Sequence, residues 1–99
     1  MMDVQRADGT VTIVVSGDID LSNADTFEDR LDGEIDSRVT DVTLDLSQVE
    51  YLDSAGVRVM FTLAARLETR QIELHLVIPP GSRARRILEI AGFPVPSAD

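Results

Sequence analysis

Apolar residues recur along the chain with two spacings, one typical of strands and one typical of helices. The segment VTIVVSG, residues 11–17, is rich in β-branched apolar residues, as expected of a buried strand. The segment DVQRADGT, residues 3–10, predicts an edge strand, and Asp8-Gly9 predicts the turn between the two. The sequence therefore predicts an opening antiparallel hairpin.

Two further strands are predicted later in the chain. Val42, Leu44 and Leu46 alternate with polar residues, which places their side chains on one face of a strand. The segment ELHLVIPPG, residues 73–81, predicts a buried strand that ends at two prolines. The final segment, FPVPSAD, also contains two prolines, so no regular strand is expected there.

Three segments, over about residues 23–36, 55–70 and 83–91, carry apolar residues at helical spacing. The polar face of the first segment is acidic, and we expect it to face solvent. The residues expected to face the core are Ala24, Phe27, Leu31 and Ile35 in the first helix, Val57, Met60, Phe61, Ala64 and Leu67 in the second, and Ala84, Ile87, Leu88 and Ala91 in the third.

Each predicted helix is preceded by a residue suited to cap it. Ser22 or Asn23 is expected to cap the first helix, Ser54 the second and Ser82 the third, because a side-chain oxygen accepts from free N–H groups at a helix start. Gly92 is a stop signal for the third helix.

The element order, β-β-α-β-α-β-α, predicts a single α/β domain over residues 1–99, with its core at about 2–93 and a tail at 94–99. Strands joined through a helix are expected to run parallel, whereas the opening hairpin is antiparallel. The predicted fold is therefore a mixed four-stranded sheet with three helices.

Charge and composition narrow the classes of function. The net charge is −9, and it is uneven: residues 1–53 hold 14 Asp or Glu against 3 Arg, whereas residues 54–99 hold 4 against 6 Arg. An acidic chain repels the phosphate backbone, so we expect no direct binding to nucleic acid. The expected partner is another protein or a small ligand.

The expected location is the cytoplasm. The chain has no cysteine, which excludes disulfides and thiolate metal sites and fits a reducing compartment. The first residues lack the pattern of a signal peptide, and no apolar run approaches the roughly 20 residues needed to span a bilayer. We therefore expect no membrane insertion.

The segment VEYLDSAGV, residues 49–57, raises the question of catalysis by Ser54. A hydrolase nucleophile elbow requires Gly two residues before the serine, where this chain has Leu52. The one histidine, His75, lies in a predicted strand, where a structural role is favoured. One His and no Cys leave mainly carboxylates as metal ligands, and their spacing matches no calcium-binding loop. The sequence predicts no enzyme activity, no metal and no cofactor.

Ser54 is instead a candidate phosphoacceptor. A hydroxyl at a helix start is exposed, and the small residues Ala55 and Gly56 would let a partner's catalytic site approach it. A phosphate adds about −1.5 to −2 charge, which the helix N-terminus favours and Asp53 disfavours by comparable amounts. We therefore expect phosphorylation to change which partner binds and to leave the fold intact.

Three segments, VSGDIDLSNADTF, LDLSQVEYLDSAGVRVM and HLVIPPGSRARRILEIAGF, resemble in this order the STAS domain family of bacterial anti-sigma factor antagonists. The resemblance implies that the unphosphorylated protein binds an anti-sigma factor, which is also a serine kinase, and thereby frees a sigma factor for transcription. It also implies that this kinase phosphorylates Ser54 and that a phosphatase resets the protein. The residues expected to bind the partner around the phosphosite are Asp20, Asp53, Ala55, Gly56 and Arg58.

Two other functions stay open. Related domains serve as binding subunits of transporters or signalling complexes without phosphorylation, and here Arg58, Arg83, Arg85 and Arg86 would dock the partner. The last three arginines, near the start of the final predicted helix, could alternatively bind the phosphates of a nucleotide or another small ligand. A solvated basic surface is the simpler interpretation of these arginines, because no glycine-rich phosphate loop is present.

Overall fold

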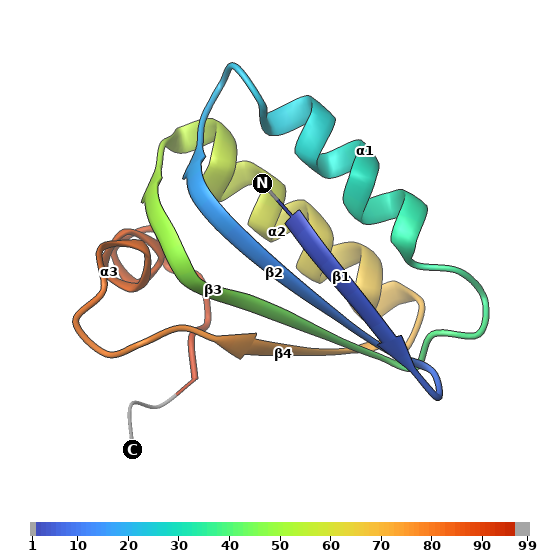
Figure 1. Ribbon diagram of the computed structural model, residues 1–99. Coiled ribbons are helices and arrows are strands. Elements are labelled where there is room, and N and C mark those ends of the chain that lie inside the picture. The colour runs from blue at the N-terminus through green and yellow to red at the C-terminus, as the bar shows by residue number, and fades with distance from the viewer. Residues whose placement is uncertain (1, 97–99) are drawn as a thin grey trace.

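The computed structural model describes residues 2–96, which form four strands and three helices (Figure 1). Residues 97–99 of the predicted tail lie outside the described part. The predicted element order is confirmed. The strands are β1 (Met2–Ala7), β2 (Thr10–Ile19), β3 (Asp41–Leu52) and β4 (Glu73–Val77), and the helices are α1 (Ala24–Glu34), α2 (Ser54–Thr69) and α3 (Arg83–Ile90).

The four strands form one mixed sheet, as predicted, and their order in it is β1-β2-β3-β4. Strands β1 and β2 are antiparallel, whereas β2 with β3 and β3 with β4 are parallel. In the hairpin turn Asp8 has φ 52° and Gly9 has φ 85°. Two consecutive left-handed residues match the right-handed twist of the paired strands, which explains why the Asp-Gly pair makes this turn.

The core lies between the sheet and the helices. In Figure 1, α2 lies behind the sheet, α1 lies to the upper right of β1, and α3 lies to the left of β3. The helix-facing residues of the two central strands are fully buried, and the four residues predicted for the inner face of the first helix are also buried. The strand residues are Val11, Ile13 and Val15 of β2 and Val42, Leu44 and Leu46 of β3; the other four are Ala24, Phe27 and Leu31 of α1 and Ile35, which directly follows α1.

The buried face of α2 differs from the predicted one. Its buried residues are Gly56, Val59, Met60, Leu63 and Leu67, whereas Val57 and Ala64 are half-buried. Phe61, predicted to face the core, is 40 % exposed, and its ring packs edge-on against Phe93 with a centroid distance of 5.1 Å. Apolar residues surround most of this helix, so their spacing alone did not identify the inner face.

Helix α3 begins and stops where the sequence predicted. The hydroxyl oxygen of Ser82 accepts a hydrogen bond from the N–H of Arg85 at 3.2 Å, and Gly92 follows the helix with φ 83°. Ala84 and Leu88 are buried and Ile87 is half-buried. Ala91, predicted to face the core, is exposed because the helix ends at Ile90 and the chain turns away.

The predicted cap of the first helix is wrong. Asn23 precedes α1, but its side chain makes no capping hydrogen bond. Its amide donates to the carbonyl of Asp18 at 2.9 Å, and its oxygen accepts from the N–H of Asp20 at 3.0 Å. Ser22 bonds to the Asp20 carboxylate. Both side chains therefore close the loop before α1 instead of capping the helix.

Candidate functional site

Two chain segments meet at the carboxyl ends of β2 and β3. Residues 20–23 follow β2 and lead into α1, whereas Asp53 follows β3 and leads directly into α2. Because β2 and β3 are parallel neighbours with Ile19 opposite Leu52, these two junctions lie side by side (Figure 1). This edge of a parallel sheet is where loops commonly build binding surfaces.

Asp53 is the N-cap of α2. One carboxylate oxygen, Oδ1, accepts hydrogen bonds from the N–H groups of Ala55 at 2.8 Å and Gly56 at 3.1 Å. The other oxygen, Oδ2, accepts from the N–H of Leu21 at 3.0 Å. The hydrogen bond from Gly56, followed by those from Leu21 and Ala55, holds the pKa of the Asp53 carboxyl below its usual value. Asp53 is therefore a charged hydrogen-bond acceptor at neutral pH.

Ser54 is the first residue of α2, and the prediction that it caps the helix is wrong. The carboxylate one residue earlier satisfies the N–H groups that the serine would have capped. Ser54 is exposed, and within residues 2–96 its hydroxyl forms no hydrogen bond. The hydroxyl therefore lies at the N-terminus of α2 and does not stabilise the helix.

Gly56 is buried beneath the site because α2 lies very close to the end of β2. A Cβ atom at this position would lie 2.6 Å from the carbonyl oxygen of Ile19 and 3.1 Å from a side-chain carbon of Leu52. The same Ile19 carbonyl accepts a hydrogen bond from the N–H of Asp53 at 3.2 Å. Gly56, expected from the resemblance to contact a partner, thus fixes the approach of the helix to the strand.

The β2–α1 loop is held by its own hydrogen bonds. The carbonyl of Asp20 accepts from the N–H groups of Asn23 at 3.1 Å and Ala24 at 2.8 Å, and its carboxylate accepts from the N–H of Ser22 at 3.0 Å. Leu21 stands between these groups with 81 % of its surface exposed. Leu21 was not among the predicted site residues; the signal for it in the sequence is an apolar residue inside a polar turn.

Arg58 lies one turn into α2 and faces α1. Its guanidinium nitrogens lie 3.7 Å from a carboxylate oxygen of Asp25 and 3.9 Å from one of Glu28. Arg66 lies 3.4 Å from Glu28 and is also paired with Asp32. The acidic face of α1, expected to be solvated, is thus partly paired with arginines of α2.

The three arginines of α3 do not form one cationic site. Arg83 and Arg86 are exposed, but Arg85 is buried, with 7 % of its surface accessible. The Arg85 guanidinium donates to the carbonyls of Ile78 at 3.0 Å and of Pro96, and it lies 3.3 Å from a carboxylate oxygen of Glu89. The prediction that Arg85 binds a partner or a phosphate is wrong, because its hydrogen bonds fasten the chain after α3 to the end of β4.

His75 lies on β4, as predicted, and is exposed. The prediction that this strand is buried is wrong, because β4 is an edge strand of the sheet and its residues are exposed or half-buried. Its Nε2 is 3.2 Å from a carboxylate oxygen of Asp41 and 3.5 Å from one of Glu73. Hydrogen bonds from Thr40 and then His75 lower the pKa of Asp41. Asp41, Glu73 and His75 could together hold a metal ion. Among residues 2–96 they form the one group of three or more His, Cys, Asp or Glu residues whose ligand atoms all lie within 4.8 Å of one another. The hydrogen bond between His75 and Asp41 accounts for the arrangement without an ion.

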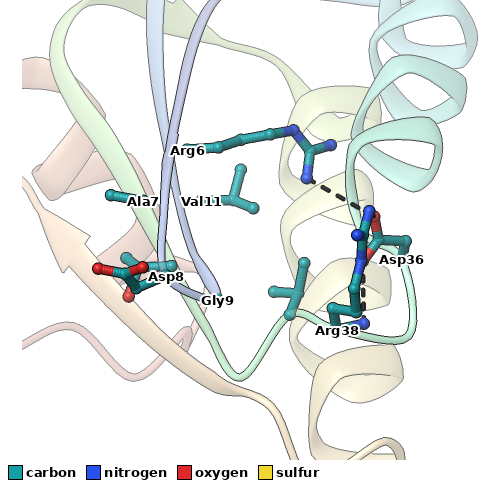
Figure 2. A pocket seen from close by; sticks show the side chains of 9 residues that line it. Arg6, Ala7, Asp8, Gly9, Val11, Asp36 and Arg38 are labelled. Atoms are coloured by element: carbon teal, nitrogen blue, oxygen red, sulfur yellow. Dashed lines mark hydrogen bonds and ion pairs between the residues drawn. The ribbon is translucent and has the colours of Figure 1, made fainter.

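A pocket of about 240 Å³ lies beneath the β1–β2 hairpin, at the end of β2 remote from Ser54 (Figure 2). Arg6 donates to Glu34 at 2.9 Å and lies 3.8 Å from Asp36, and Arg38 lies 3.4 Å from the same carboxylate. Figure 2 shows both guanidinium groups directed at Asp36. Because both arginines are already paired with carboxylates, this pocket is poorly suited to bind an anionic ligand.

Comparison with known proteins identifies the family. Residues 1–95 match the sequence pattern of the STAS domain family. The chain belongs to the STAS domain family. The sequence is 33 % identical over 91 residues to a protein of Bordetella bronchiseptica that is provisionally named anti-sigma factor antagonist BtrV, covering 91 % of this chain and 77 % of that protein.

Solved structures show the same fold. An anti-sigma factor antagonist from Mycobacterium paratuberculosis is 28 % identical, with a TM-score of 0.77 and coverage of 98 % of this chain and 86 % of that one. The antagonist SpoIIAA in its unphosphorylated form is 18 % identical, with a TM-score of 0.75 and coverage of 93 % and 81 %. The Bacillus SpoIIAA in its phosphorylated form gives a TM-score of 0.71. This STAS domain also resembles part of Mglu, at 22 % identity and a TM-score of 0.71, but spans only 20 % of that chain.

Within the described residues, no helix is both long enough and apolar enough to cross a bilayer.

Proposed function

We propose that this STAS protein is an anti-sigma factor antagonist that binds an anti-sigma factor kinase and is released from it by phosphorylation of Ser54. The observation that carries the proposal is the exposed Ser54 hydroxyl at the start of α2, which has no hydrogen-bond partner among the described residues because Asp53 caps the helix. The names of BtrV and of the Mycobacterium paratuberculosis protein support the antagonist role. The phosphorylated structure of SpoIIAA supports the switch.

The geometry suits Ser54 to accept a phosphate from another protein's active site. Ala55 follows it with a small, half-buried side chain, so little of the protein's own surface obstructs an incoming nucleotide. Asp53 already accepts three N–H hydrogen bonds and has a lowered pKa, which makes it a poor base for the serine proton. The kinase would therefore supply the base and the metal ions for phosphoryl transfer.

Phosphorylation would add about −1.5 to −2 charge beside the Asp53 carboxylate. The N-terminus of α2 favours this charge and Asp53 disfavours it, so the fold should persist. A partner surface that fits the neutral serine would have to desolvate a dianion, and about 2.7 kcal/mol of lost binding energy already weakens affinity a hundredfold. Phosphorylation of Ser54 would thus leave the domain folded and cause the complex to dissociate.

Intact-protein and peptide mass spectrometry after incubation with the anti-sigma factor kinase and ATP tests the proposal. We expect one phosphate, on Ser54, in the wild type and in the control Ser37→Ala, which removes an exposed serine elsewhere. Ser54→Ala should take up none. An unmodified wild type, or equal phosphorylation of Ser54→Ala, would refute the assignment. A partner that binds equally whether or not Ser54 is phosphorylated would instead favour the unmodified binding-subunit role.

A further inference from the structure

Leu21 is the most exposed of the large apolar side chains in residues 2–96, at 81 %, and Ile90 is next at 80 %. A single exposed leucine is common on protein surfaces and by itself indicates nothing. What distinguishes Leu21 from Ile90 is how its backbone is held and what lies beside it.

The backbone of Leu21 is fixed on both sides. Its N–H donates to Asp53, the N–H of Asp20 donates to the Asn23 side chain, and the N–H of Ser22 donates to the Asp20 carboxylate. A partner that buries a side chain on an ordered loop does not have to order the loop backbone as well, which makes this burial more favourable.

Leu21 also lies close to Ser54. The N–H of Leu21 and those of Ala55 and Gly56 share the two oxygens of one carboxylate, that of Asp53. A standard protein interface covers about 800 Å² on each partner. An interface of this size centred on Ser54 therefore extends to Leu21.

The surroundings of Leu21 are acidic. Asp18 and Asp20 precede it, Asp53 holds its N–H, and Asp25 begins the polar face of α1. Arg58, one turn into α2, is already paired with Asp25 and Glu28. A complementary partner surface has an apolar pocket for the leucine and a basic rim.

We propose that Leu21 is the apolar anchor by which this protein binds its anti-sigma factor kinase, inserting into an apolar pocket with a basic rim. This inference rests on the function proposed above. Leu21 would supply a large part of the binding energy but is not itself modified. Affinity would therefore depend on Leu21, whereas phosphorylation takes place on the neighbouring Ser54.

Calorimetric titration of the unphosphorylated full chain with the anti-sigma factor kinase tests the anchor. Leu21→Ala should weaken binding by about 10-fold to 100-fold, because the buried apolar area is lost. The control Ile90→Ala removes an equally exposed apolar side chain from α3 and should change the Kd by less than about twofold. Both variants should unfold at the wild-type temperature, since neither side chain is buried.

Two outcomes distinguish the proposed role of Leu21 from the proposed antagonist function. If the wild type binds and Leu21→Ala binds with the same Kd, the anchor is refuted and the antagonist function stands. If the wild type binds no anti-sigma factor kinase, both are refuted. The basic rim predicts that the association rate falls as ionic strength rises; a rate that stays constant or increases contradicts it.

Discussion

The N–H of Leu21 donates a hydrogen bond to Oδ2 of Asp53 at 3.0 Å, joining residues that are 32 positions apart in the sequence. The other oxygen of the same carboxylate caps α2 through Ala55 and Gly56. One side chain thus connects the loop after β2 to the helix after β3. The surface around Ser54 is therefore a single unit whose two halves depend on Asp53.

The substitution Asp53→Asn tests this connection. An amide has one accepting oxygen instead of two, so either Leu21 or the first turn of α2 loses its acceptor. We expect faster amide hydrogen exchange either at Leu21 or at Ala55 and Gly56, and a lower urea midpoint, both measured at pH 7. The control Asp29→Asn, on the exposed face of α1, should leave both unchanged. Wild-type exchange at all three amides in Asp53→Asn would show that the carboxylate is dispensable.

The pKa of Asp53 predicts how stability depends on pH. The hydrogen bond from Gly56 and then that from Leu21 lower this pKa in the folded protein, relative to about 3.9 in an unfolded chain. The unfolded state therefore binds the proton more readily, so this contribution to stability is fully present above about pH 4 and is lost as pH falls through the folded pKa.

Urea unfolding at pH 7, 5, 4 and 3 measures this dependence. The free energy of unfolding of the wild type minus that of Asp53→Asn should be constant from pH 7 to pH 5 and shrink below about pH 4. Taking the difference removes the contributions of Asp36 and Asp41, whose pKa values are also lowered. A difference that is unchanged at pH 3 would contradict the assigned pKa.

Gly56→Ala should destabilise the protein although alanine is the better helix former. The added Cβ would lie 2.6 Å from the Ile19 carbonyl oxygen, a backbone atom that cannot easily move. We expect a loss of about 1–3 kcal/mol in chemical unfolding, typical of overpacking. Gly33→Ala is the matched control in α1, where nothing lies within 4 Å, and it should stabilise by about 0.5–1 kcal/mol. The same sign for both variants would contradict the packing argument.

Arg85→Ala should destabilise the protein because it removes the donor shared by the carbonyls of Ile78 and Pro96. Loss of charge-assisted hydrogen bonds from a buried side chain predicts a cost of about 1–3 kcal/mol. Arg86→Ala, at the next and exposed position, should change the free energy of unfolding by less than about 0.5 kcal/mol. Equal effects of the two substitutions would contradict a structural role for Arg85.

Features that depend on neighbouring residues were predictable from the sequence. The Asp8-Gly9 turn and the buried face of α1 follow from local chemistry and regular spacing. The inner face of α2 was misjudged at Phe61, because apolar residues on several sides of the helix leave its orientation to tertiary packing.

The site was only partly predictable. The sequence predicted that Ser54 lies at a helix start. It did not predict which residue caps the helix, because the adjacent Asp53 competes for the same N–H groups. The bond from Leu21 to Asp53 arises from the parallel alignment of β2 with β3, and no local pattern encodes it. The burial of Arg85 likewise depends on where the chain after α3 returns.

The affinity of the anti-sigma factor kinase for this protein, with and without phosphoserine incorporated at position 54, tests the central claim most directly. We expect the phosphorylated protein to bind about 100-fold more weakly than the unmodified one while its circular dichroism and cooperative unfolding stay the same. Equal affinity of the two forms would contradict the proposed switch. Loss of cooperative unfolding on phosphorylation would contradict the claim that the charge acts on the interface and leaves the fold intact.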